Sequence, residues 1–258
     1  MPPQFFALKL GASSLLYLVA TPLGNLGDFS FRAVEVLQKC SYILCEDTRH
    51  SSVLLHHYNI KKELKSFHSF NEAGRERSVI EDLKNGLDIA LISDAGTPAI
   101  CDPGERLLER CYKEKIGITS IPGPCALAVA LSLCSFRKEK IQFLGFCPKK
   151  EGERTTFFSQ ILTFSGSSFF YETPHHIEDT LEHIVRLDPK RKVGIYRELT
   201  KKFEEIIEKE ASDLLSYIKE KGCKGEIVVG VEGEKGVFSL IEIKKLVFLA
   251  GHFVLGAH

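Results

Sequence analysis

The chain has 258 residues, 44% of them hydrophobic and 26% charged, which is typical of globular proteins and unlike the composition of disordered chains. Its 34 basic residues balance 34 acidic ones, so no global field attracts a polyanion and any contact with nucleic acid must use local basic surfaces. The eight cysteines include no CxxC pair, and no window approaches the roughly twenty apolar residues of a membrane-spanning helix. We therefore expect a reduced, cytoplasmic chain that contains neither a disulfide framework nor a membrane segment.

Residues 1–14 lack the charged-then-apolar order of a secretory signal and are expected to form an N-terminal extension. From Leu15 onward, short β-branched or aromatic runs alternate with amphipathic stretches, a pattern that predicts an α/β fold with a largely parallel or mixed sheet. In the first half, the pattern predicts strands at Leu15–Ala20, Ser41–Cys45, Leu64–His68, Asp88–Ser93 and Ile118–Ile121.

Helices are expected between these strands, most clearly at Glu72–Lys84, with Asn71 as its cap and Gly86 just past its end. Pro124 is expected to begin another helix. The charged patch that starts at Arg137 predicts a boundary between domains 15–136 and 137–235, followed by an atypical apolar segment, 236–258. In the second domain we expect strands at Ile141–Phe146, Ser168–Glu172, Val193–Arg197 and Glu226–Val231, and helices at Glu153–Leu162, Pro174–Leu187 and Ala211–Lys221.

Four loops follow predicted strands of the first domain, where open α/β sheets place their ligands. They are Thr21–Asp28, which contains two glycines, Cys45–His50, Ser93–Gly104 and Pro122–Pro124. The third has two Gly, two Pro and two Asp, which predicts a long ordered turn with backbone groups and carboxylates open to a ligand. It lacks the Gly-Lys-Ser/Thr end of a P-loop. Together the four loops predict a small-molecule site.

The loop after the second strand compresses Glu46, Asp47, Arg49 and His50 into five positions. One interpretation is structural, with Asp47 or Thr48 capping the helix that follows and acids in its first turn. That interpretation leaves the immediate succession of a guanidinium and an imidazole unexplained, so a chemical role stays open beside it.

These loops and several later segments closely resemble the ribosomal RNA small-subunit methyltransferase I family. The resemblance runs from Leu15 to Gly233 in the order and spacing of the family, with departures at Cys101, Thr173 and His176, where the family usually has Ser, Ser and Arg. The segments that carry it are Val19–Leu26, Cys45–Arg49, Ser93–Gly104, Pro122–Pro124, Phe143–Phe146, Phe170–His175, Arg197–Lys201 and Gly225–Val229.

The resemblance implies a two-domain α/β fold like that of the tetrapyrrole methylases, with S-adenosylmethionine in the cleft between the domains, and a homodimer. It further implies transfer of the cofactor's methyl group to the ribose 2′-oxygen of a cytidine in 16S ribosomal RNA. Naked RNA and the assembled small ribosomal subunit both stay open as the substrate.

Candidate site residues follow from the loops and the resemblance together. For cofactor binding they are Pro22, Asp94, Ala95, Gly96, Thr97, Ile100, Cys101, Pro122, Gly123 and Cys125, with Asp94 assigned to the polar half of the cofactor. A base within hydrogen-bond reach would activate the poorly nucleophilic hydroxyl, and Glu46, Asp47 and His68 are candidates, although His68 also fits a structural role.

Phosphate contacts are expected from Arg49, Lys149, Lys150, Arg197 and Lys201, although basic runs of this kind also occur as solvated faces. No metal is expected, because His175, His176 and His183 match no standard zinc spacing.

Two alternatives stay open. A tetrapyrrole C-methyltransferase of the precorrin type would share the architecture and hold a macrocycle. A non-catalytic ribosome-assembly or RNA-binding factor would keep the fold without the reaction. Titration with S-adenosylmethionine and transfer of labelled methyl groups to RNA would separate these possibilities.

Overall fold

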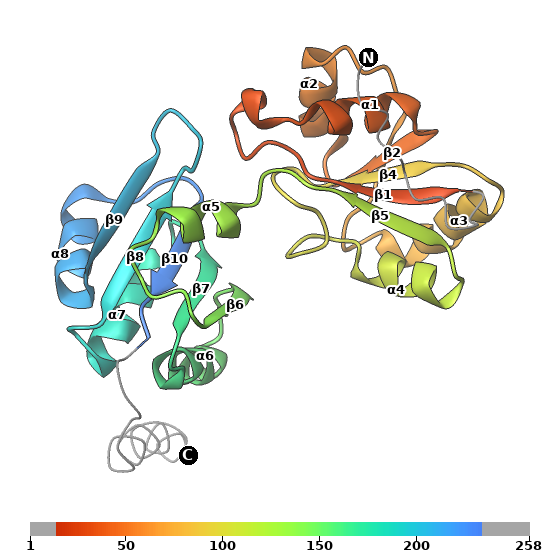
Figure 1. Ribbon diagram of the computed structural model, residues 1–258. Helices are drawn as coiled ribbons and strands as arrows, with labels where there is room; N and C mark the ends of the chain where they lie inside the picture. The colour runs from red at the N-terminus through yellow and green to blue at the C-terminus, as the bar shows by residue number, and fades with distance from the viewer. Residues whose placement is uncertain (1–13, 234–258) are drawn as a thin grey trace. The chain divides into compact units, whose positions relative to one another are not determined.

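The computed structural model describes residues 14–233, which divide after Cys125 into two compact α/β units (Figure 1). Within that described range, no helix is both long and apolar enough to cross a lipid bilayer. All eight cysteines are free thiols, as expected. The expected N-terminal extension, apart from Ser14, and the C-terminal segment 236–258 lie outside the described residues.

The first unit, which ends at Cys125, is built on a five-stranded parallel sheet with the strand order β3-β2-β4-β1-β5. All five strands expected here are present, and none of their ends differs by more than two residues. Their bounds are β1 Leu15–Val19, β2 Tyr42–Cys45, β3 Leu64–Ser66, β4 Ile89–Ile92 and β5 Gly117–Ile121.

Helices cover both faces of this sheet because successive residues of each strand point to opposite sides. Ile43 and Cys45 of β2 pack with α1 and α2, whereas Tyr42 and Leu44 pack with α3 and α4. Figure 1 shows α1 and α2 on one side of the sheet and α3 and α4 on the other. The helices are α1 Phe31–Lys39, α2 Thr48–His57, α3 Glu72–Lys84 and α4 Glu105–Lys113, and a short 3₁₀ helix, η1, spans Leu26–Asp28.

Helix α3 has the bounds expected from the sequence, and Asn71 occupies its N-cap position without a side-chain cap hydrogen bond. Asn71 precedes the helix without capping it through its side chain, because its Oδ1 accepts from the backbone N–H of His68 instead, at 2.9 Å. Gly86 follows the helix with a φ of +91°, as the C-terminal signal predicted.

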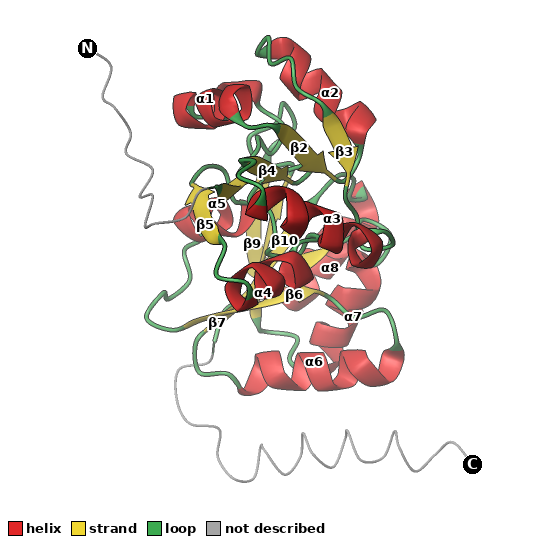
Figure 2. Ribbon diagram, turned by 90° about the vertical axis from the view of Figure 1, so that its right-hand side faces the viewer, coloured by secondary structure: helices red, strands yellow, loops and turns green. Residues whose placement is uncertain are grey.

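The second unit, which begins at Ala126, contains a five-stranded sheet with the order β6-β7-β10-β8-β9 (Figure 1), and Figure 2 draws its strands in yellow and its helices in red. Only β6 and β7 pair in parallel; β10 is antiparallel to β7 and β8, and β8 to β9. The strands are β6 Ile141–Phe146, β7 Ser167–Glu172, β8 Lys192–Arg197, β9 Glu205–Glu210 and β10 Ile227–Val231.

Strand β9 was missed by the sequence analysis. Its sequence, Glu-Ile-Ile-Glu-Lys-Glu, carries four charges in six residues, which is unfavourable for a strand on propensity alone. The strand forms because it lies at the edge of the sheet and pairs with β8 along its whole length, while its charged side chains face solvent or polar partners.

Two layers of helix enclose the second sheet. Helices α6 Glu151–Thr163, α7 Ile177–Leu187 and α8 Ala211–Lys221 pack in one cluster with the sheet, and α5 Ala126–Leu133 packs in another with Phe169 and Tyr196. Because α5 shares the core of the second unit, the division falls eleven residues before the boundary expected between 136 and 137. Helix α5 also starts two residues after Pro124 rather than at it.

Candidate functional site

The polar residues expected to form a site follow the carboxyl ends of the parallel strands in the first unit, where the loops after β1, β2, β4 and β5 meet. A two-way backbone bridge ties the first of these loops to the third. Thr21 N donates to Gly96 O at 2.8 Å, and Gly96 N donates to Thr21 O at 3.0 Å. The buried Thr21 hydroxyl adds a bond to Ser93 O at 3.1 Å. The loop Ser93–Gly104 is therefore fixed where it leaves β4.

A second connection joins this loop to the turn after β5. The Thr97 hydroxyl donates to Pro124 O at 3.0 Å, which links two candidate cofactor loops directly. Gly96 has a φ of +81° and Ala99 a φ of +62°, a region that non-glycine residues rarely adopt. A residue such as Ala99 stays there only where surrounding contacts hold it, and such strain is concentrated at ligand-binding sites.

Gly123 allows the turn after β5 to lie against the end of β1. A Cβ added at Gly123 would come within 3.0 Å of Ala20 Cβ, closer than side chains normally pack. Pro122 and Gly123 are both exposed. This turn thus offers backbone groups rather than side chains to a ligand.

Three carboxylates gather at this edge of the sheet: Glu46 after β2, and Asp94 and Asp102 in the loop after β4. Asp94 Oδ1 accepts from the backbone N–H of Asp47 at 3.3 Å, which brings the two loops together. Burial, followed by repulsion from Asp102 and Asp94, raises the pKa of Glu46 to about 7. Burial and Asp94 likewise raise the pKa of Asp102 to about 6. Within residues 14–233 none of the three pairs with a lysine or arginine, so together they favour a cation.

Asp47 has a different environment from its neighbour. Its Oδ1 accepts from Arg49 N at 2.8 Å and caps α2, and its Oδ2 lies 2.8 Å from Arg49 Nη2. The hydrogen bond from the Arg49 side chain is the main cause that lowers the pKa of Asp47 to about 2. The structural interpretation of Asp47 as a cap therefore holds, and its partner in the cap is Arg49.

His68 lies in the turn between β3 and α3. Asn71 Nδ2 contacts its Nε2 at 3.2 Å, and its Nδ1 is buried without a hydrogen-bond partner among the described residues. Phe67 N donates to Cys45 O at 2.7 Å and extends the pairing of β2 with β3 by one residue. His68 follows Phe67 and Glu46 follows Cys45, so both lie just beyond the carboxyl ends of the neighbouring strands β3 and β2.

The other candidate cofactor residues lie in the loops after β1, β4 and β5. Pro22, in the loop after β1, is buried; in the loop after β4, Ala95 is half-buried and Ile100 exposes 46% of its surface. Burial, followed by the charge of Asp102, raises the pKa of Cys101. The first unit by itself therefore brings together every residue expected to bind the cofactor.

The basic candidates are divided between the two units. Arg49 lies in the first unit, and Lys149, Lys150, Arg197 and Lys201 lie in the second. Arg197 Nε bonds to Glu205 Oε2 at 2.9 Å, and Lys201 Nζ bonds to Glu198 Oε1 at 2.9 Å. These two side chains hold β8 to β9 and close the turn after β8, whereas Lys149 and Lys150 are exposed.

The sequence analysis did not select Asp102, Thr21 or Ser93 as site residues. Asp102 shares its loop with Asp94 at a spacing of eight residues, and the doubled Asp in so compact a turn was the signal available. Thr21 and Ser93 bear no sequence signal, because their role is to fix two loops that are about seventy residues apart in the chain.

A family model described as "Tetrapyrrole (Corrin/Porphyrin) Methylases" matches residues 15–215 of the chain. A protein of Hydrogenobaculum sp. (strain Y04AAS1), named "Ribosomal RNA small subunit methyltransferase I", is 42% identical over 86% of this chain and 97% of its own length. A protein of the same name from Escherichia coli O157:H7 is 41% identical over 85% of this chain and 78% of its own.

Two solved structures are similar in fold. A cobalt precorrin-4 methyltransferase covers 85% of this chain and 95% of its own, with a TM-score of 0.63 and 12% identity. A uroporphyrin-III C-methyltransferase from Thermus thermophilus covers 92% and 97%, with a TM-score of 0.59 and 16% identity. Because the family model spans most of the chain and relatives of 42 and 41% identity align over 86 and 85% of it, the chain belongs to the tetrapyrrole methylase family and, within it, to the ribosomal RNA small subunit methyltransferase I family.

Proposed function

We propose that the chain transfers a methyl group from S-adenosylmethionine to the ribose 2′-hydroxyl of a cytidine in 16S ribosomal RNA. The observation that carries the proposal is the match to relatives named as small-subunit ribosomal RNA methyltransferases, at 40 to 42% identity over 84 to 88% of the chain. The tetrapyrrole enzymes share 12 and 16% of their residues with it and speak for the fold alone. The carboxylates and loop backbones at the carboxyl edge of the first sheet support catalysis over a purely binding role.

The residues at the carboxyl edge of the first sheet fit S-adenosylmethionine. The cofactor carries a positive sulfonium and an ammonium group, and Glu46, Asp94 and Asp102 form a carboxylate cluster without basic partners among residues 14–233. The adenosine part requires hydrogen-bonding backbone groups, which we propose that the loops around Gly96 and Gly123 supply. Neither glycine has room for a side chain, because an added Cβ would come within 3.1 Å of Leu23 or 3.0 Å of Ala20, so these loops pack closely.

When bound, S-adenosylmethionine supplies an electrophilic methyl group. We propose that Asp94 binds the polar half of the cofactor and that the loop backbones orient the remainder. The residues assigned to this task are Pro22, Asp94, Ala95, Gly96, Thr97, Ile100, Cys101, Pro122, Gly123 and Cys125. Fixed placement of two reactants can supply about 7–11 kcal/mol of a barrier, which explains why these loops are tied to one another.

Among the three candidate bases, we propose Glu46. A general base works best when its pKa is near the working pH, and the carboxylate of Glu46 has a pKa of about 7. Asp47 is a far weaker base, since its pKa is about 2 and both oxygens bind Arg49. His68 shares one ring nitrogen with Asn71, and we propose that it orients the turn after β3. Glu46 would accept the proton of the 2′-hydroxyl on a carboxylate oxygen.

For phosphate contacts, we propose the exposed cations Arg49, Lys149 and Lys150. Arg49 and Lys150 keep 90% and 83% of their side chains exposed despite ion pairs with Asp47 and Glu153. Arg197 and Lys201 expose only 19% and 25% within their ion pairs, and we propose that they fix the turn after β8. We further propose that the protein acts in the cytoplasm and that it is a homodimer. Light scattering on a size-exclusion column tests the dimer, because the measured mass should be that of two chains rather than the 28.9 kDa of one.

The test is methyl transfer from labelled S-adenosylmethionine to small ribosomal subunits that lack this modification, followed by nucleoside analysis. We expect label in 2′-O-methylcytidine, and its loss on Asp94→Ala together with loss of cofactor binding. Cofactor binding without RNA labelling would refute the proposed substrate. Labelling that survives Asp94→Ala would refute the assignment of the cofactor loop. Parallel reactions with naked 16S RNA identify the form of the substrate.

A further inference from the structure

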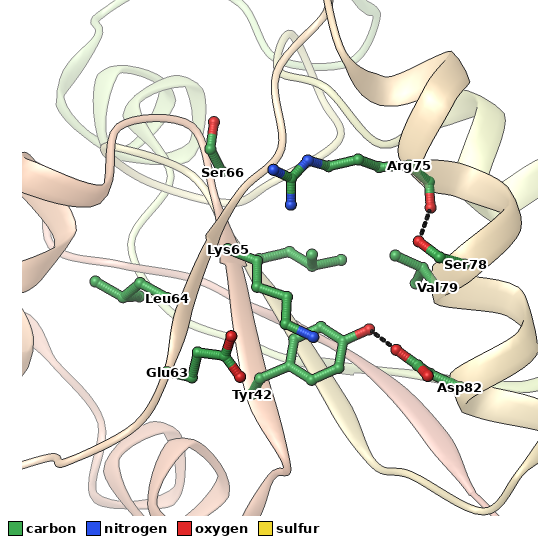
Figure 3. A pocket seen from close by; sticks show the side chains of 10 residues that line it. Tyr42, Glu63, Leu64, Lys65, Ser66, Arg75, Ser78, Val79 and Asp82 are labelled. Atoms are coloured by element: carbon green, nitrogen blue, oxygen red, sulfur yellow. Dashed lines mark hydrogen bonds between the residues drawn. The ribbon is translucent and has the colours of Figure 1, made fainter.

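An open pocket of about 430 Å³ lies between the edge strand β3 and helix α3, outside the carboxylate site (Figure 3). Its walls are mostly polar, which distinguishes it from the largely apolar pockets that bind uncharged small molecules. The residues that line it are Tyr42, Leu44, Glu63, Leu64, Lys65, Ser66, Arg75, Ser78, Val79 and Asp82. The volume is sufficient for part of a nucleotide.

At one end of this pocket, Tyr42 contacts two charged side chains, Asp82 and Lys65. Tyr42 Oη donates to Asp82 Oδ2 at 2.8 Å, and the Lys65 ammonium lies 3.5 Å from the centre of the Tyr42 ring. Figure 3 shows Glu63 at this same end, and Arg75 and Ser66 at the other. The end that Arg75 and Ser66 line therefore lies apart from the carboxylates of Glu63 and Asp82.

That second end is cationic. Arg75 is exposed, and in the part of the chain that the structure describes no carboxylate lies within ion-pairing distance of its guanidinium. The Ser66 hydroxyl accepts from Asn71 Nδ2 at 3.3 Å, so its own proton is left to donate. A guanidinium beside a hydroxyl donor suits a phosphate oxygen, and Arg pairs with phosphate in a planar, two-point geometry.

The turn that connects Ser66, at the end of β3, to helix α3, which bears Arg75, presents an exposed ring. Phe70 is 96% exposed, and its ring lies 6.0 Å from the ring of His68 in an edge-on arrangement. Because Phe70 is so exposed, its ring buries almost no apolar area within the chain and so adds little to the stability of the fold. Unstacked RNA bases stack on such aromatic side chains, in a manner that tolerates any base.

The pocket adjoins the carboxylate site through the sheet. Ser66 ends β3, and the bond from Phe67 N to Cys45 O places the next residues beside the end of β2, where Glu46 follows. A strand of RNA that presents one nucleotide to Glu46 thus has neighbouring nucleotides within reach of this turn.

We infer that Arg75 and Phe70 form a subsite for a nucleotide that flanks the methylated one, with Arg75 and Ser66 binding its phosphate and Phe70 stacking on its base. This inference rests on the proposed function for the identity of the ligand. It assigns to the pocket a role in RNA affinity and none in cofactor binding or proton transfer.

The experiment measures two quantities for the full chain: binding of unmodified small ribosomal subunits as a function of salt, and the KM and kcat of methyl transfer to them. Phe70→Ala should weaken binding and raise KM by roughly 5- to 150-fold, the range for loss of one stacked base. Arg75→Gln should weaken binding on the order of tenfold and reduce the salt slope by about one. In both variants kcat should change little, and binding of S-adenosylmethionine should stay as in the wild type.

Arg77→Gln is the matched control. Arg77 lies on the same helix, is 88% exposed and bonds to Glu81 at 3.1 Å, away from the pocket. It should leave binding, salt slope and KM unchanged, and thermal unfolding should show all three variants folded. If Phe70→Ala and Arg75→Gln match Arg77→Gln in binding and KM, the subsite is refuted while the proposed function stands.

The binding measurement separates the two proposals further. If the wild type binds subunits without methylating them and both pocket variants bind more weakly, the subsite stands and the proposed reaction fails. If the wild type neither binds nor methylates them, both fail. A fall in kcat alone, with KM and binding unchanged, would also overturn the subsite.

Discussion

Replacing Glu46 with Gln should stabilise the protein at alkaline pH while it removes activity. The pKa of Glu46 is raised from 4.5 to about 7, chiefly by burial and then by the charges of Asp102 and Asp94. The folded state therefore keeps a proton that the unfolded chain has already released. Stability from this group is complete below pH 4.5 and is lost as the pH rises through 7.

The size of the effect follows from the pKa difference. At 1.36 kcal/mol per pKa unit, the change from 4.5 to about 7 corresponds to about 3 kcal/mol. Because the carboxylate is only half-buried and solvent screens it, we take about half, on the order of 1 to 2 kcal/mol. Glu46→Gln should thus raise the free energy of unfolding by that amount at pH 8 and leave it close to the wild type at pH 4.5.

Urea unfolding followed by circular dichroism at pH 4.5, 6 and 8 measures this difference. Glu35→Gln, a change at an exposed glutamate 3.9 Å from Lys39, is the control and should shift stability by less than about 1 kcal/mol at every pH. In parallel, methyl transfer by the wild type should rise with pH through about 7, and Glu46→Gln should lower the rate by about 10²–10⁴.

Two outcomes would contradict this reasoning. A variant that is no more stable than the wild type at pH 8 would mean that the carboxylate is not destabilised by its surroundings. A variant that retains the wild-type rate and its pH dependence would show that another group accepts the proton.

Two further predictions concern the second unit. Gly230→Ala should destabilise the chain by about 1–3 kcal/mol in urea unfolding, because the added Cβ would come within 2.8 Å of the Phe169 ring. Gly152→Ala, whose Cβ meets nothing within 4 Å inside a helix, should instead have no cost or raise stability by about 0.5–1 kcal/mol; equal effects of the two changes would refute the packing argument. Arg154→Met should lower the free energy of unfolding by about 1.5–3 kcal/mol, because this buried guanidinium bonds to Thr180 Oγ1 at 3.0 Å. An unchanged urea midpoint would show that the network around it re-forms without the cation.

Much of the architecture could be predicted from the sequence, because local apolar runs mark strands wherever both faces of a sheet are buried. Strands β1, β2 and β4 can be identified from such apolar runs, and both ends of helix α3 can be located from the sequence. The loops that follow those strands were equally visible, since Gly, Pro and Asp gather where backbone turns and polar groups are required.

What the sequence alone could not decide depends on partners far away in the chain. Strand β9 has a polar sequence and exists because β8 pairs with it, and α5 was assigned to the wrong side of the division because its packing partners, Phe169 and Tyr196, lie well beyond it. Asn71 looked like a cap, yet its side chain bonds to the turn before it.

The clearest case is the pair Glu46 and Asp47. In the sequence they are adjacent carboxylates, both of them candidates for the same role. In the fold one is part-buried against two carboxylates that arrive from the loop after β4, and the other is exposed beside Arg49 at the start of a helix. Burial, followed by the charges of Asp102 and Asp94, raises the pKa of Glu46 to about 7, whereas the hydrogen bond from the Arg49 side chain is the main cause that lowers the pKa of Asp47 to about 2. Arg49 is two positions from Asp47 in the chain, but only the tertiary structure brings Asp94 and Asp102 to Glu46.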